Sequence, residues 1–355
     1  DNELVIVGDP SADPLLVLHA AVTAVRSGLP LARQSLRLLA ERQSDLPDPW
    51  PHGARDLFVE LLSGGHRAIP VIESLDYFEV WTHLLPEWTP NRSRPQRNVY
   101  HRFTVDRHLL ETVAEAARLT QRVRRPDLLL VAALLHDIGK GYPGDHTEVG
   151  VRLVGPIASR CGFSASDAEV LSRLVEHHLL LPDVATRRDL EDTQTIRVVA
   201  EKVETVEFLE LLAALTEADS IATGPTAWGE WKAHLVETLA VLVTDYISSD
   251  GSTRRKRRSF VTQQLESLMA EGETVVQGSG DTVTIVAPDR AGTFSRAAGA
   301  LALRGLDVLQ ADAYSSEAGM AVSQFRVAEP DTPVDWERVT EDVYQCLDGH
   351  LAIDS

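Results

Sequence analysis

The chain has 355 residues, of which 44% are hydrophobic and 25% charged, so it can bury two or three ordinary cores and is neither disordered nor fibrous. The chain has only two cysteines, which excludes a disulfide framework and a cysteine zinc site. Its net charge of −19 disfavours nucleic acid as a partner. Since the sequence has no long apolar stretch and no secretory signal, we expect no membrane partner and a cytoplasmic location.

Residues 1–96 predict a helical segment without a dense cluster of catalytic residue types. Leu4–Val7 is a candidate single strand, and apolar residues then recur at helical spacing from Pro14 to Glu41. Another helix is expected to start near Ala54. Because the chain opens without an initiator methionine, we interpret it as a piece of a longer protein.

Residues 97–249 form the second predicted domain, and it is again helical. Apolar runs lie at 109–117, 128–135, 168–175 and 206–215. Six of the twelve histidines fall between His101 and His178, so this domain is the candidate site of chemistry.

Residues 250–281 are predicted to be a basic linker. A Gly-Ser break precedes five consecutive basic side chains, Arg254–Arg258. The run is typical of a nuclear-localisation or nucleic-acid arm, but it fits better a solvated helix start or a patch for an acidic partner surface.

Residues 282–355 predict a small α+β domain. Strand patterns at 282–286, 308–314 and 321–327 alternate with helical patterns at 294–303 and 334–346. This order favours an antiparallel sheet with helices on one face.

One constellation in the second domain is typical of a metal site. An apolar helix runs directly into His136-Asp137, and Gly139 and Lys140 follow. Adjacent helical side chains point about 100° apart, so both can reach one ion only where the helix ends at a cavity, and a glycine can supply that end. His108 on an earlier helix and Asp219 on a later one complete the set of ligand types.

The ordered set His108, His136-Asp137 and Asp219 resembles the HD-domain metal-dependent phosphohydrolases, which are all-helical and bind a divalent ion through those side chains. By the same resemblance, His146, His177 and His178 are candidate ligands of a second metal, and at least two of them are expected to bind that metal or the phosphate. The alternative is that one imidazole only hydrogen-bonds a ligating carboxylate.

Longer phrases are similar to the family of bifunctional uridylyltransferase/uridylyl-removing enzymes. They are Tyr100–His108, Gly144–His146, Arg187–Leu190 and Ala222–Pro225 with Trp228 and Trp231. Two features of that family are missing. The sequence has no Gly-Ser followed closely by Asp-x-Asp, the motif that holds the metals of the nucleotidyltransferase, so we expect no nucleotide transfer. The family also usually has two small C-terminal domains of the ACT type, and this sequence has room for only one.

The last domain resembles an ACT domain in Ala287–Phe294 and Arg304–Val308. ACT domains are small ferredoxin-like modules that bind amino acids, so the resemblance implies glutamine as an effector, with Asp289, Gly292 and Phe294 as candidate binding residues. A plain turn between strand and helix with a core phenylalanine explains the same residues equally well. The predicted fold class is therefore mainly α, with a helical N-terminal segment, an all-α HD domain and this α+β domain.

The resemblance implies hydrolysis of the phosphodiester that links UMP or AMP to a tyrosine of the PII signalling protein, under regulation by glutamine. Imidazole and carboxylate ligands suit Mn²⁺, Mg²⁺, Fe²⁺ or Zn²⁺, and the resemblance favours one or two ions of Mn²⁺ or Mg²⁺. We assign catalytic roles to Asp137 and to Lys140, the latter as a phosphate contact. Hydrolysis of a free nucleotide, or an inactive glutamine-sensing module, are the alternatives.

Overall fold

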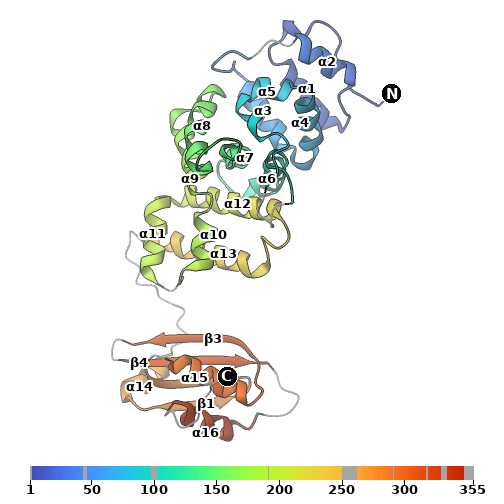
Figure 1. Ribbon diagram of the computed structural model, residues 1–355. Coiled ribbons are helices and arrows are strands. Elements are labelled where there is room, and N and C mark those ends of the chain that lie inside the picture. Colours follow the sequence, from blue (N-terminus) through green and yellow to red (C-terminus); the bar gives the residue numbers. More distant parts are fainter. Residues whose placement is uncertain are drawn as a thin grey trace. The chain divides into compact units, whose positions relative to one another are not determined.

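The computed structural model describes residues 2–42, 46–96, 102–190, 192–249, 262–290, 292–316, 319–328 and 334–347. Internal contacts divide the chain into unit 1, Asp1–Thr253, and unit 2, Arg254–Ser355 (Figure 1). The basic run Arg254–Arg258 lies outside the described residues. The predicted fold class, mainly α with a small C-terminal α+β unit, is confirmed. None of the described helices is both long and apolar enough to cross a membrane.

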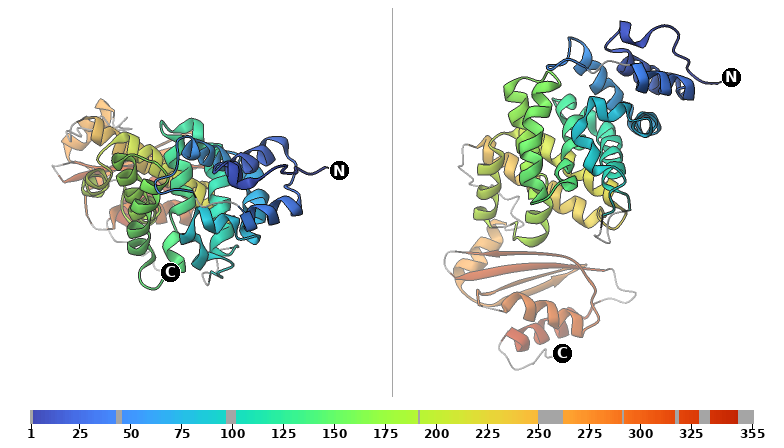
Figure 2. Two further views of the ribbon diagram at one scale, coloured as in Figure 1. Left: turned by 90° about the horizontal axis from the view of Figure 1, so that it is seen from above. Right: turned by 45° about the horizontal axis from the view of Figure 1, so that its top comes forward.

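Unit 1 is helical throughout its described residues, as the blue to yellow ribbon shows in both views of Figure 2. Its α-helices are α1 (Leu16–Ser27), α2 (Arg33–Arg42), α3 (Ala54–Ser63), α4 (Ala68–Tyr77), α5 (Val80–Leu84), α6 (Val105–Leu119), α7 (Pro126–Leu135), α8 (His146–Arg160), α9 (Ala165–His177), α10 (Leu180–Arg187), α11 (Thr193–Val203), α12 (Val206–Thr223) and α13 (Glu230–Ser248). Two 3₁₀ turns bear on the site, η3 (Pro86–Asn91) and η5 (Ile138–Gly141).

The strand predicted at Leu4–Val7 does not form. Leu4 makes a single parallel bridge to Leu31, and Val5 and Val7 are exposed. A β-pattern without a row of partners along its length cannot build a ladder, so the prediction is wrong here.

Helix α7 forms the centre of unit 1. Residues 128–135 are all apolar and all buried, and α3, α6, α9 and α12 pack around them. A helix that is apolar on every side is expected to lie inside a bundle rather than on its surface. Pro126 at its first position and Asp127 in its first turn suit the start of a helix. The C-terminal end of α7 and the residues that follow it therefore lie in the middle of unit 1.

Unit 2 contains a four-stranded antiparallel sheet in the order β1-β2-β4-β3. Its elements are α14 (Gln263–Glu271), β1 (Val275–Ser279), β2 (Thr282–Pro288), α15 (Thr293–Leu303), β3 (Val308–Ser315), β4 (Met320–Val327) and α16 (Trp336–Leu347). The domain thus begins earlier than residue 282, since α14 and β1 lie within the segment predicted as a linker. The ring of Trp336 packs directly on Gly278 of β1. A β-carbon at position 278 would lie 2.2 Å from this ring.

Helices cover both faces of this sheet, not one face as predicted. Val283, Ile285 and Phe325 pack with α15 and α16 on one side. Leu265 and Met269 of α14 pack on the other side, against a cluster formed by Val286, Met320 and Val322. Neighbouring residues of a strand point to opposite faces, so β2 and β4 serve both layers.

Candidate metal centre

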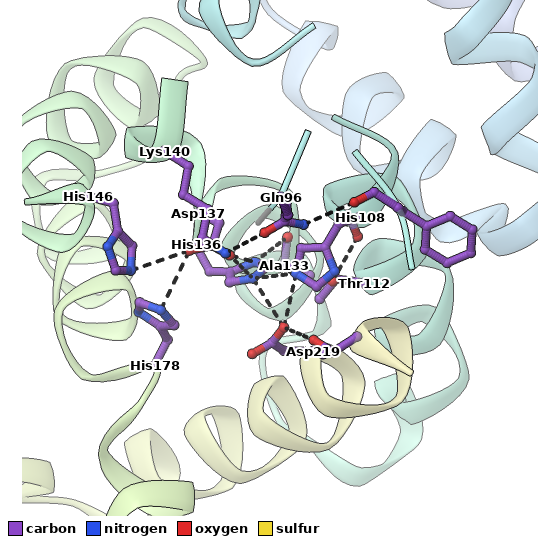
Figure 3. Close-up of polar contacts among 12 residues, drawn as sticks. Gln96, His108, Thr112, Ala133, His136, Asp137, Lys140, His146, His178 and Asp219 are labelled. Carbon is purple, nitrogen blue, oxygen red and sulfur yellow. Dashed lines mark hydrogen bonds and ion pairs between the residues drawn. The ribbon is translucent and has the colours of Figure 1, made fainter. Parts of the chain in front are cut away.

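Six of the seven predicted metal ligands meet at the end of α7 (Figure 3). They come from separate elements of unit 1: His108 from the first turn of α6, His136 and Asp137 from the residues after α7, His146 from the start of α8, His178 from the residue after α9, and Asp219 from α12.

The turn after α7 allows adjacent side chains to serve one site. His136 is still helical in its backbone, whereas Asp137 leaves the helix at φ −114° and ψ 15°. Gly139 is not a left-handed cap, because its φ is not positive. Its role is close approach: a β-carbon on Gly139 would lie 2.0 Å from the His146 carbonyl oxygen and 2.7 Å from the Gly150 nitrogen. The missing side chain thus lets α8 begin against the turn and brings in His146.

The first ligand group consists of His108, His136 and Asp219. Asp219 Oδ1 lies 3.1 Å from His108 Nε2 and 3.5 Å from His136 Nε2, and the two Nε2 atoms are 3.3 Å apart. Both imidazoles are completely buried. Three ligand atoms within 4.8 Å of one another can surround a single cation.

The second ligand group consists of Asp137, His146 and His178. Asp137 Oδ1 lies 3.7 Å from the Nε2 atom of each of the two histidines. His178 is buried, whereas 34% of the His146 side chain is exposed. This group therefore opens toward solvent on the His146 side.

Asp137 joins the two groups. Its Oδ2 lies 3.4 Å from His136 Nε2 and 3.7 Å from His108 Nε2, while its Oδ1 faces the second group. Figure 3 shows His146 and His178 on one side of Asp137 and His108 and Asp219 on the other. Asp137 Oδ1 is buried and accepts no hydrogen bond from the described residues. A buried carboxylate oxygen without a donor is costly unless a cation satisfies it, so the residues present fit one or two divalent ions.

Backbone carbonyls orient two of the imidazoles. His136 Nδ1 lies 2.9 Å from the Ala133 carbonyl oxygen, and His178 Nδ1 lies 2.6 Å from that of Val175. Because a carbonyl only accepts, each Nδ1 carries the hydrogen and donates it. In the neutral ring, the lone pair then sits on Nε2, which faces the carboxylates. This arrangement is common among metal-binding histidines.

The carboxylates and the imidazoles of the site shift one another's pKa values. Burial opposes a charge on His136, but Asp137 and Asp219 outweigh burial and raise its pKa to about 10. Burial likewise opposes charge on Asp137 and Asp219, yet His136 holds the pKa of both well below the usual range. Burial lowers the pKa of His178. Since a metal-bound imidazole must be deprotonated, an ion entering the first group would compete with the proton on His136.

The segment that contains the site matches a known protein family. The model described as "HD domain" matches residues 105–224, a range that contains all six clustered ligands. The chain carries an HD domain. This match, together with the cluster, supports a hydrolase of the HD family that uses a divalent metal.

Curated relatives extend the similarity beyond the HD domain. One, from Streptomyces coelicolor, is 50% identical over 252 residues, which are 70% of this chain and 30% of that protein. Another, from Mycobacterium tuberculosis, is 44% identical over 338 residues, which are 92% of this chain and 41% of that protein. Both are named "Bifunctional uridylyltransferase/uridylyl-removing enzyme". The chain thus spans less than half the length of these relatives, and its predicted resemblance to them is confirmed.

The predicted ligand His177 does not lie in the ligand cluster. His177 is the last residue of α9, one position before His178, so its side chain points about 100° away from that of its neighbour. Its ring stands against Phe208 instead, with the centroids 6.5 Å apart, and burial lowers its pKa. The assignment of His177 as a ligand is therefore dropped, whereas His146 and His178 remain candidates.

Lys140 lies beside the ligands and is engaged by two partners. Its Nζ lies 2.5 Å from Asp137 Oδ2 and donates to Gln96 Oε1 at 2.8 Å. Gln96 donates in turn to the Phe103 carbonyl at 3.4 Å. Lys140 thus holds one oxygen of the bridging carboxylate, and its cation is already paired with that carboxylate.

The segment before the HD domain holds the metal-ligand turn in place, a role that sequence reasoning missed. The buried Asn91 donates to the Ile138 carbonyl at 2.9 Å, and Arg94 donates to the Gly141 carbonyl at 3.1 Å. Together with Gln96, they connect η3 and the following residues to η5. Their types are unremarkable in sequence, so only the folded chain reveals them.

A cleft of about 1170 Å³ opens over the ligands. Asp137, His146, His178 and Asp219 line it together with Lys140, and further along its wall lie Asp183, Thr186, Ser220, Thr223, Thr226 and Lys232. This volume far exceeds that of a phosphate group and lies just above the range of about 300–1000 Å³ that is typical of small-molecule sites. Lys232 and the hydroxyls were not predicted from the sequence.

The candidate effector residues lie in unit 2 at the turn between β2 and α15. Gly292 precedes α15 with φ +89°, a left-handed conformation that suits glycine. The Asp289 nitrogen donates to the Gly319 carbonyl at 2.8 Å. Phe294 is 43% exposed, and its ring lies 5.0 Å from that of Phe325. The turn and the partly core phenylalanine are present as the structural interpretation expects, and a role in glutamine binding stays a prediction.

Proposed function

We propose that this chain hydrolyses the phosphodiester between a nucleoside monophosphate, UMP or AMP, and a tyrosine of the PII signalling protein. The observation that carries the proposal is the bridging position of Asp137. One of its carboxylate oxygens faces each ligand group, and Oδ1 is buried without a hydrogen-bond donor among the described residues. The cleft above it has room for a nucleotide.

The proposed ligands are His108, His136 and Asp219 in the first group and His146 and His178 in the second, with Asp137 between them. A divalent ion held there supplies Lewis acidity to a phosphoryl oxygen and makes water a stronger acid. The chemistry of the donors, nitrogen and carboxylate oxygen without sulfur, suits Mn²⁺, Mg²⁺, Fe²⁺ or Zn²⁺, and we favour Mn²⁺ or Mg²⁺.

The chain's own residues contribute orientation and charge. Ala133 and Val175 carbonyls fix the ring planes of His136 and His178 before substrate arrives. Lys140 holds Asp137 Oδ2 in place and offsets part of the negative charge that would repel a phosphodiester. A tyrosine leaving group, with a pKa of about 10, needs only modest assistance from an acid.

The substrate assignment is drawn from the relatives. Their name states uridylyl removal, and the similarity covers 92% of this chain in one case. We further propose that glutamine acts through unit 2, whose sheet with helices is consistent with an ACT-like domain and whose turn at Asp289, Gly292 and Phe294 leaves Phe294 partly exposed. Hydrolysis rates that are equal with and without glutamine would contradict this regulation.

The decisive experiment measures release of UMP and of AMP from correspondingly modified PII in the presence of Mn²⁺. The full chain is compared with a His136→Ala plus Asp137→Ala variant and with a matched control, His52→Ala plus Asp245→Ala, whose residues are exposed and outside the cleft. Release that only the site variant abolishes supports the proposal and identifies the nucleotide. Activity on free nucleotides with none on modified PII would favour the alternative of a free-nucleotide phosphohydrolase.

A further inference from the structure

Lys232 is a cation of the cleft that the ligand set does not use. It lies in the first turn of α13, after the loop that follows α12, and its side chain is half-buried in the cleft wall. Lys232 Nζ donates to Ser220 Oγ at 3.3 Å and to the Ala227 carbonyl at 3.0 Å. Because Ser220 follows Asp219 directly, the ammonium group is anchored one residue from a predicted metal ligand.

Lys232 differs from Lys140 in the charges that lie around it. Among the described residues, no carboxylate oxygen is recorded within ion-pair distance of its Nζ, whereas Lys140 lies 2.5 Å from Asp137. Burial lowers the pKa of Lys232, and the more distant carboxylates of Asp219 and Asp183 offset only part of that effect. A half-buried cation of this kind is stabilised by an anion that enters the cleft.

The wall around Lys232 is suited to phosphate oxygens. Ser220 and Thr226 line the cleft together with Lys232, and hydroxyls donate readily to phosphoryl oxygens. Thr223 also lines the cleft, but its hydroxyl donates to Asp219 Oδ1 at 3.4 Å. An ammonium group has three donors, of which two are used within the protein. With respect to the described residues, one donor is left for a ligand.

We propose that Lys232 binds a phosphoryl oxygen of the nucleotide substrate, while Lys140 serves to hold Asp137. This inference rests on the proposed function, which supplies the phosphodiester. It reassigns the phosphate contact predicted for Lys140 to a residue outside the HD-domain match. The competing explanation is structural: Lys232 only ties the Ala227 loop to α12.

Substitutions can separate charge from loop anchoring. Lys232→Arg keeps the cation. Lys232→Gln keeps a donor for the Ala227 carbonyl but removes the charge, and Lys232→Met removes both. Lys202→Met is the matched control, because Lys202 is exposed on α11 and lies outside the cleft. Circular dichroism and thermal melting verify that each full-length variant is folded.

The readouts are the dissociation constant of UMP in the presence of Mn²⁺ and the KM and kcat for uridine 5′-(4-nitrophenyl) phosphate. A charge-assisted hydrogen bond predicts that Lys232→Met and Lys232→Gln weaken UMP binding and raise KM by about tenfold. Lys232→Arg should stay within about threefold of the wild type, and Lys202→Met should not differ from it.

Two results would overturn the proposal. In one, the wild type hydrolyses the ester and Lys232→Gln matches it in UMP affinity and KM, so that only the role of Lys232 is refuted. In the other, the wild type neither hydrolyses the ester nor binds UMP, so that the proposed function fails and the phosphate contact fails with it.

Discussion

The two ligand groups of the site differ in how the protein encloses them. His108, His136 and Asp219 project from α6, α7 and α12, which pack on one another in the core, and both imidazoles are fully buried. His146 and His178 stand at the ends of α8 and α9 beside the cleft, and a third of the His146 side chain is exposed. The imidazoles of the first group are thus enclosed by the core, whereas the second group reaches solvent through His146.

The ligands of one polar cluster are thus positioned in two ways, by packing in the core and by contacts at the ends of helices. Core packing leaves the first group little freedom, so an ion there would find its ligands already placed. The second group depends on α8 beginning against the turn at Gly139, where the two backbones approach closely. We therefore expect substitutions in the two groups to differ in size and in kind.

The largest expected effect is on hydrolysis after His136→Ala, on the order of 10³-fold, because this change removes a fully buried ligand from the first group. His146→Ala should cost about tenfold, since its side chain is partly exposed at the rim of the second group. Turnover of the nucleotidyl ester and Mn²⁺ titration of both variants provide the measurement, with His52→Ala as the control. Equal losses in the two variants would remove the distinction between the groups.

Gly139→Ala tests the close approach of α8 to the turn after α7, on which only the second group depends. Its β-carbon would lie 2.0 Å from the His146 carbonyl oxygen, a backbone atom that cannot rotate away. We expect a loss of about 3 kcal/mol in the free energy of unfolding. Urea denaturation measures this loss, and Gly229→Ala, where a β-carbon meets nothing within 4 Å, is the control. A Gly139→Ala protein as stable as the control would contradict the close approach.

Asn91→Ala tests whether the segment before the HD domain supports the first group. The change leaves the Ile138 carbonyl without its donor next to Asp137. We expect a loss of about 1–2 kcal/mol in stability, together with a fall in kcat that exceeds any change in KM. Urea denaturation and steady-state kinetics measure the two effects. The exposed Gln194→Ala on α11 is the control, and a kcat equal to that of the control would show that Asn91 does not position the turn.

Gln96→Ala should have the smallest effect of the four. It removes one acceptor of Lys140, but Asp137 Oδ2 still holds the ammonium group. We expect kcat to fall by about threefold, which corresponds to less than about 1 kcal/mol. A fall as large as that for His136→Ala would mean that Gln96 itself touches the substrate.

Much of this architecture was accessible from the sequence, for reasons visible in particular residues. The periodicity of residues 109–117 and 206–215 predicted α6 and α12, and the apolar run at 128–135 predicted α7, because helices that line a core carry their signal locally. The ligand types His108, His136, Asp137 and Asp219 were likewise recognisable, and the structure brings them together.

The remaining features depend on distant contacts. His177 and His178 are equivalent as letters, and only the exact phase of α9 decides which imidazole reaches Asp137. The strand β1 was missed because Val275–Ser279 is short and becomes a strand by pairing with β2. Asn91, Gln96 and Lys232 are single polar residues without a pattern, and their importance arises from the neighbours that folding supplies.

The support of the metal-ligand turn by η3 bears on how much of the chain must be moved to transplant the site into another protein. Asn91 and Gln96 lie before residues 105–224, and Lys232 lies after them. A chimera that exchanged only the matched segment would part Lys140 from Gln96 and the Ile138 carbonyl from Asn91. The part of unit 1 that holds the ligands and lines the cleft is therefore wider than the matched segment, and it extends from η3 to the start of α13.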